Sequence, residues 1–236
     1  AEGAKGETKE VLCNYLGTDD FASYAKEYLN KIKEYNTEDE SYGYKSKLKI
    51  ADAVWVDNNL TLQEEFKNSV TNGFGAEVEN VDFSAAEKTC GIINSWCDKN
   101  TEGLIPKIIT PDQINDTTGL CLTNSLYFES GWSGEPWNVS DTEEKFGNNE
   151  KTKYMTCAGD RYYENDKATA FDMEYANGLS FVGILPVDEG DFTLEDLDIG
   201  GLLKSQPEYD EVQCKMPKLD FETTAILNDI LSSLGL

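Results

Sequence analysis

The residue types that most often carry hydrolytic or metal chemistry are absent from this chain or widely scattered along it. The sequence contains no histidine, which excludes a Ser/His/Asp triad, a Cys/His pair and every metal site that needs an imidazole. The segment Gly73–Gly75 is typical of a helix end followed by a turn, and does not form a phosphate-binding loop. We therefore expect no enzymatic activity, no metal and no cofactor.

The cysteines do not have the spacing of a metal site or a redox motif. They include no Cys-x-x-Cys pair, which argues against a zinc ribbon and against a thioredoxin-type site. Their positions are Cys13, Cys90, Cys97, Cys121, Cys157 and Cys214. On one predicted helix, Cys90 and Cys97 would have Cα atoms about 10 Å apart, beyond disulfide reach. Buried thiols are the favoured interpretation.

Composition and charge narrow the possible partners. Forty-five acidic and twenty basic residues give a formal net charge of −25, which repels phosphate backbones and anionic lipid surfaces. No apolar run is long enough to cross a bilayer, and the first residues do not resemble a secretion leader. We expect no nucleic acid and no membrane as partners, and a monomer whose 236 residues form a single domain.

The order of the predicted elements indicates an α+β domain. Helical spacing of apolar residues predicts early helices over 6–16, 21–35, 61–74 and 84–103, and alternation predicts strands at 45–56, 117–132 and several places after 146. Asn177-Gly178 lies between two apolar runs and predicts a hairpin. The last predicted elements are a strand over 211–222 and a helix that begins near Thr223. Helices early and strands late are typical of α+β folds rather than of repeated βαβ units.

Two polar residues interrupt apolar strand faces. Asp52 falls on the same face as Ile50 and Val54, and Asn124 falls on the same face as Leu122 and Leu126. A buried amide without a hydrogen-bond partner costs about 1–3 kcal/mol, and a buried carboxylate is also unfavourable. Each of these two side chains should therefore be bound to a neighbouring element.

Five sequence segments, in order along nearly the whole chain, resemble those of the serpin family. They are IADAVWVDNNLTLQEEF, NSWCDKNTEGLIPKII, LTNSLYFESGWSGEPW, LSFVGILPVDEG and MPKLDFE. The resemblance implies a large central mixed β-sheet, further β-sheets and surrounding helices. It also implies that residues 1–236 form the middle of that fold, without its first helices and without the reactive loop.

The resemblance further implies a suicide inhibitor of serine or cysteine proteases. In this family a protease cleaves the exposed loop, and the loop then inserts as a new strand into the central sheet. A non-inhibitory serpin that acts as a carrier or chaperone is the alternative. Family habit implies secretion into the extracellular space, and the unpaired cysteines keep a cytoplasmic location open.

The resemblance also assigns roles to individual residues. Asn124 resembles the family's shutter asparagine, Trp132 the tryptophan at the top of the sheet where insertion begins, and Lys218 a lysine that pairs with a glutamate outside this chain. Asp52 replaces the family's usual asparagine, and Glu129 replaces its usual lysine. The alternative is ordinary packing: a satisfied core asparagine, a core aromatic ring and a solvated lysine.

Overall fold

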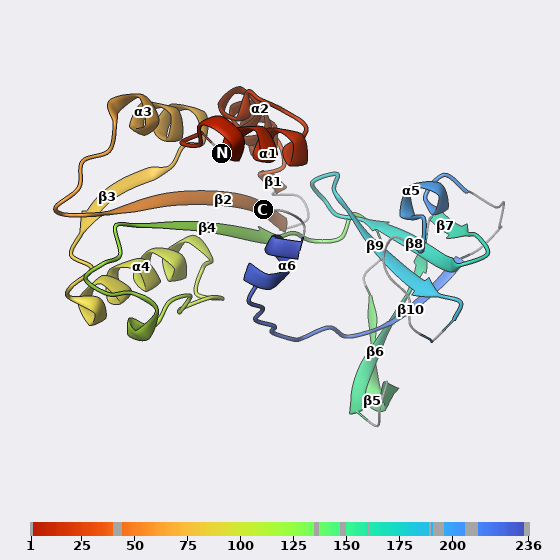
Figure 1. The fold of residues 1–236 in the computed structure, drawn as a ribbon. Helices are drawn as coiled ribbons and strands as arrows, with labels where there is room; N and C mark the ends of the chain where they lie inside the picture. The colour runs from red at the N-terminus through yellow and green to blue at the C-terminus, as the bar shows by residue number, and fades with distance from the viewer. Residues whose placement is uncertain are drawn as a thin grey trace. The chain divides into compact units, whose positions relative to one another are not determined.

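The computed structural model describes residues 2–39, 44–134, 137–146, 150–159, 161–188, 190, 196–205 and 212–233. The chain divides into two compact units (Figure 1). The first comprises Ala1–Thr37, Ser46–Glu129 and Ala225–Leu236, and the second comprises Glu38–Lys45 and Ser130–Thr224. Both combine segments that are distant in the sequence. The prediction of a single domain remains untested by this division.

A sheet built around one long strand organises the first unit. Strand β2 (Tyr44–Asp57) pairs in parallel with β3 (Glu77–Val81) and antiparallel with β4 (Leu120–Glu129), and β1 (Thr37–Asp39) also pairs with β2. Helices cover both faces of this sheet (Figure 1). The helices of this unit are α1 (Gly6–Leu16), α2 (Phe21–Lys33), α3 (Glu64–Gly73), α4 (Ala86–Asn100) and α6 (Asn228–Ser233), together with the 3-10 turn Pro111–Gln113.

The two faces of β2 are buried against different helices. Ala53 and Trp55 pack with Cys90 and Cys97 of α4, whereas Val54 and Val56 pack against the α3 side. Coverage on both faces explains why this part of β2 is a continuous apolar run. For Cys90 and Cys97 the interpretation as buried thiols on one helix is confirmed, because they are only 3% and 1% exposed.

The second unit contains two antiparallel sheets. One has the order β10-β6-β5, and the other has the order β7-β8-β9. Their strands are β5 (Asn138–Phe146), β6 (Glu150–Gly159), β7 (Arg161–Glu164), β8 (Ala168–Glu174), β9 (Ser180–Pro186) and β10 (Val212–Pro217), with the short helix α5 (Ile199–Leu202) beside them. The predicted hairpin is confirmed: Gly178 has a φ of +82° and its N–H donates to the Tyr175 carbonyl at 2.9 Å.

Three predictions about which apolar faces are buried are wrong. On β4 the row that contains Leu122 and Leu126 is 64% and 57% exposed, while Ser125 and Tyr127 of the opposite face are buried. The largely aromatic stripe that helical spacing predicts to face the core from the second helix is buried only at Phe21 and Ile32, and Tyr24 is 66% exposed. Ile226, predicted to be buried in the last helix, is 84% exposed. The spacing of apolar residues shows which side chains share one face of a strand or helix. Burial also requires another element that covers this face.

The structure also places some ends of helices and strands at other residues than the sequence predicts. The strand predicted over 211–222 ends at Pro217, and the following helix begins at Asn228 rather than near Thr223. Ser84 does not cap α4, because its hydroxyl donates to Asp82 and the helix begins at Ala86. The helical turn predicted over 192–197 lies mostly outside the described residues.

Candidate functional site

The two polar residues predicted to need partners bind each other. Asp52 of β2 and Asn124 of β4 are directly opposite in the antiparallel register, and Asn124 Nδ2 donates to Asp52 Oδ1 at 2.9 Å. Asp52 is half-buried and Asn124 is exposed. Facing residues of antiparallel strands bring their Cβ atoms within about 5.5 Å, so the register itself positions the pair. The carboxylate therefore gains a hydrogen bond without a counter-charge.

A hollow of about 250 Å³ lies beside this pair on the α3 side of the sheet. Its lining is apolar apart from a few polar groups, and it comprises Glu2, Asp52, Ala53, Val54, Phe66, Val70, Phe74, Ala76, Leu122, Thr123 and Asn124. The exposed row of Leu122 and Leu126 continues from it along β4. Within the described strands β4 pairs only with β2, so its other edge carries no strand there.

Charged and phenolic side chains lie where the first half of β2 pairs with the end of β4. Glu129, which stands where the family has lysine, faces Lys47 in the register and accepts a hydrogen bond from the Tyr127 hydroxyl at 2.8 Å. This bond to a carboxylate raises the pKa of Tyr127 above its ordinary value. The Lys47 ammonium forms an ion pair with Glu102 and lies 5.7 Å from the Tyr127 ring centre.

Trp132 belongs to the second unit, where it sits in an aromatic cluster. Its ring stacks on Tyr175 with centroids 4.4 Å apart, and it meets Trp137 and Phe181 edge-on at 5.8 and 6.1 Å. The backbone reinforces this contact, since Ser133 N–H donates to the Glu174 carbonyl and Ala176 N–H to the Gly131 carbonyl. Burial raises the pKa of the Tyr175 hydroxyl.

Lys218 also belongs to the second unit, and it is held by its backbone. Its N–H donates to the Lys153 carbonyl at 2.8 Å, which extends the pairing of β10 with β6 by one residue. Its side chain is exposed. No hydrogen bond, ion pair or ring contact among the described residues joins Trp132 to Lys218. Of the four residues named from the sequence, the structure thus brings together Asp52 and Asn124.

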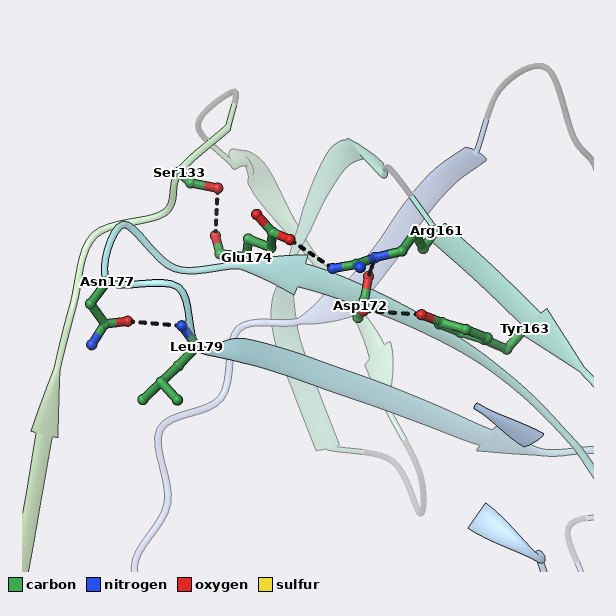
Figure 2. A network of polar contacts seen from close by, with 7 residues as sticks. All are labelled: Ser133, Arg161, Tyr163, Asp172, Glu174, Asn177 and Leu179. Carbon is green, nitrogen blue, oxygen red and sulfur yellow. Dashed lines mark hydrogen bonds and ion pairs between the residues drawn. The ribbon is translucent and has the colours of Figure 1, made fainter. Parts of the chain in front are cut away.

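A second polar network was not predicted from the sequence. Arg161 of β7, the one arginine of the sequence, donates through Nε to buried Asp172 at 2.7 Å and through Nη2 to Glu174 at 2.8 Å (Figure 2). Tyr163 donates its hydroxyl to the second Asp172 oxygen at 3.1 Å. The bond to Asp172 raises the pKa of Arg161. One signal was available, because Asp172 shares a strand face with Ala168 and Ala170.

Asn177 and Ser133 lie at the hairpin end of the same strands (Figure 2). The Asn177 side-chain oxygen accepts from Leu179 N–H at 3.2 Å, and the Ser133 hydroxyl donates to the Glu174 carbonyl at 3.2 Å. These bonds fix the turn and the segment that carries Trp132. Among the described residues no group of three or more His, Cys, Asp or Glu side chains could hold a metal ion, and no helix is long and apolar enough to cross a membrane.

Comparison with known proteins identifies the family. The family model described as Serpin (serine protease inhibitor) matches residues 1–236. Serpin-ZXA of Oryza sativa subsp. japonica is 29% identical over 261 residues, which cover 100% of this chain and 64% of the relative. Antichymotrypsin-2 of Bombyx mori is 26% identical over 248 residues, which cover 100% of this chain and 65% of the relative.

Solved structures agree with this assignment. The thermophilic serpin tengpin, in its latent state, matches with a TM-score of 0.79 and 27% identity over 99% of this chain and 64% of its own. The chain spans less than two thirds of the length of each of these three proteins. With a sheet built on β2, two further sheets and surrounding helices, this incomplete α+β fold belongs to the serpin family.

Proposed function

We propose that the protein to which this chain belongs inhibits serine proteases by inserting its cleaved reactive loop into the sheet that contains β2 and β4. The loop lies outside this chain. The observation that carries the proposal is the Asp52–Asn124 pair, a polar bond within an otherwise apolar row of side chains on the paired strands β2 and β4. A half-buried carboxylate needs a polar partner, and this bond joins β2 to β4 next to the strand edge that the proposal requires to accept the loop.

The edge of β4 is where a further strand can be accepted. An unpaired strand edge presents N–H and C=O groups that pair with an added strand. In the proposed mechanism a strand added beside β4 pairs with this edge and passes Asn124. The Asn124 amide can make several hydrogen bonds, of which Asp52 uses one N–H. The remaining groups of the amide are then available to an incoming strand.

Trp132 and Lys218 have different proposed tasks. Trp132 follows the end of β4 in the sequence, and its stack on Tyr175 anchors that connection to β8. Lys218 follows β10 and has an exposed ammonium group. We assign the Lys218 ammonium a carboxylate partner in the part of the protein outside this chain. Opening of the sheet changes whether this ion pair is formed.

The protease that is inhibited has a serine nucleophile in this proposal. Its support is the family, and the name of one relative, antichymotrypsin-2. The test is to incubate the full-length protein with trypsin-, chymotrypsin- and subtilisin-like enzymes and with a papain-like cysteine protease. A covalent complex that survives detergent and heat is expected with at least one serine protease. Cleavage of the loop with no such complex contradicts the proposal and favours the carrier alternative.

We also propose that the protein acts outside the cell, with the cytosol as the alternative. The motivation is the habit of the family, because the Asn-x-Ser/Thr sites at Asn59, Asn115 and Asn138 would accept glycans only in a eukaryotic secretory host and do not distinguish the two locations. Fractionation of the source cells with an antibody against this chain tests the location. Recovery from the medium supports secretion, and recovery with cytosolic markers contradicts it.

A further inference from the structure

Two of the buried cysteines face each other across neighbouring strands. Cys157 of β6 and Cys214 of β10 are Cα partners in the antiparallel register. They are 7% and 3% exposed, and they share a cluster with Met173. Directly opposite residues of antiparallel strands have Cα atoms about 4.5–5.5 Å apart. This separation lies inside the range of about 4.4–6.8 Å that a disulfide spans.

The surroundings leave room for both sulfur atoms on one face of β6. The Cys157 thiol donates to Met173 Sδ at 3.7 Å. Two residues further along, Gly159 provides space, since a Cβ at this position would lie 2.6 Å from Cys214 Sγ. A side chain at position 159 would therefore displace the Cys214 thiol from its place over β6. Rotation about the Cα–Cβ bonds is then enough to turn the two sulfurs toward each other.

A small molecule has a route to this pair. A hollow of about 380 Å³ is lined mainly by apolar residues of both sheets of the second unit and includes Cys214, but Cys157 does not line it. Strand β10 is an edge strand among the described strands of its sheet, and an edge strand opens locally more easily than a central one. Both thiols are almost closed to solvent, at 3% for Cys214 and 7% for Cys157, so a reagent reaches Cys214 when β10 opens locally and then finds Cys157 opposite it on β6.

We propose that Cys157 and Cys214 form a reversible disulfide by exchange with a low-molecular-weight disulfide such as glutathione disulfide. The Cys214 thiol loses its proton, its thiolate attacks one glutathione sulfur, and the first glutathione leaves as a thiolate. The Cys157 thiolate then attacks the protein sulfur of this mixed disulfide and releases the second glutathione. The two protein thiols lose two electrons, glutathione disulfide gains them, and the two protons pass to the two glutathione thiolates.

The bond would fasten β10 to β6 close to Lys218. Residues 157 and 214 enclose a long loop, so a cross-link between them restricts the unfolded chain strongly and should raise the thermal midpoint by roughly 5 °C. The proposal rests on strand register, burial and the hollow beside β10, and on no inhibitory property of the protein. It therefore holds or fails independently of protease inhibition.

The test uses the full-length native protein in buffers with rising ratios of oxidised to reduced glutathione. After the remaining thiols are alkylated, trypsin releases Cys157 in the peptide Tyr154–Arg161 and Cys214 in the peptide Ser205–Lys215. Mass spectrometry should find these two peptides linked and lighter by two hydrogen atoms, and dithiothreitol should separate them. The thermal midpoint should rise with the linked fraction.

The chain supplies its own control. Cys90 and Cys97 are equally buried but lie on one helix at a separation that a disulfide cannot span. Their shared peptide Thr89–Lys99 should stay doubly alkylated under the same conditions. In Cys214→Ser, Cys157 should be recovered as a thiol, and in Cys157→Ser, Cys214 should accumulate as a mixed disulfide with glutathione. Alkylated Cys157 and Cys214 throughout the titration, or linkage of Cys157 to other cysteines in the native protein, would overturn the proposal.

Discussion

Asn124 Nδ2 lies 2.9 Å from Asp52 Oδ1, and the two residues are direct partners across β2 and β4. Each compensates for a polar group that the other strand places on an apolar face. The bond therefore adds a side-chain link to the backbone pairing that already joins the two strands. Its consequences can be measured separately from any inhibitory activity.

Removal of the amide should destabilise the protein more than removal of the charge. Asn124→Ala leaves the Asp52 carboxylate without this donor and should lower the free energy of unfolding by about 1–3 kcal/mol. Asp52→Asn keeps an acceptor oxygen opposite Asn124 and should cost under about 1 kcal/mol. Urea denaturation of the full-length variants gives both values. Equal losses in the two variants would show that the hydrogen bond contributes little.

A double-mutant cycle isolates the coupling between the two residues. If Asp52→Ala and Asn124→Ala act through the same bond, their effects should fall short of additivity by about 0.5–3 kcal/mol. Additive effects would contradict the claim that each side chain compensates for the other.

The Arg161 network should depend on the buried carboxylate rather than on the exposed one. The Asp172 side chain is 10% exposed, whereas that of Glu174 is 49% exposed. Arg161→Ala leaves Asp172 buried with Tyr163 as its described donor and should cost about 2 kcal/mol of unfolding free energy. Glu174→Gln should cost under about 1 kcal/mol, because solvent screens exposed pairs. A loss in Glu174→Gln as large as that in Arg161→Ala would contradict this assignment.

Two glycines should respond in opposite directions to the same substitution. Gly178 has a φ of +82° in the turn between β8 and β9, so Gly178→Ala should destabilise by about 1 kcal/mol. Gly91 lies on the exposed face of α4, and a Cβ there meets nothing within 4 Å. Gly91→Ala should therefore stabilise by about 0.5–1 kcal/mol. Thermal denaturation of both variants measures these changes. Midpoints that shift in the same direction in both variants would contradict the prediction.

Buried thiols predict a loss of stability in alkali. Burial raises the pKa of Cys97 above its ordinary value of 9.0, so the folded state holds the proton more tightly than the unfolded state. As the pH rises through the unfolded pKa the unfolded thiol ionises first, and stability therefore falls until the folded pKa is reached. Cys97→Ala should show a shallower decline of unfolding free energy between about pH 8 and 9.5 than the wild type. Parallel curves would contradict the prediction.

The sequence predicted local features of the fold well where they depend on neighbours in the chain. The Asn177-Gly178 hairpin and the buried face of Cys90 and Cys97 both follow from local turn and helix geometry. The exposure of Leu122 and Leu126 could not be predicted, because it depends on which face of β4 the helix α4 covers. Alternation is the same for a covered and an uncovered row.

The candidate site was predicted only in part, because its contacts also depend on how distant strands pair. Polarity on an apolar face marked Asp52 and Asn124, but only the β2–β4 register shows that they bind each other. Arg161 and Asp172 went unnoticed because their contact joins two strands whose register is set by the intervening chain. The family resemblance named Trp132 and Lys218 and gave no information about the stack on Tyr175.

The central claim is that the sheet of β2 and β4 accepts one more strand from the protein's own reactive loop. The most direct measurement compares the full-length protein before and after cleavage within that loop, by thermal denaturation and by a crystal structure of the cleaved form. The account predicts a large rise of the thermal midpoint, with the loop inserted as an added strand of this sheet, in line with Asn124. An unchanged midpoint, with the cleaved loop outside the sheet, would contradict it.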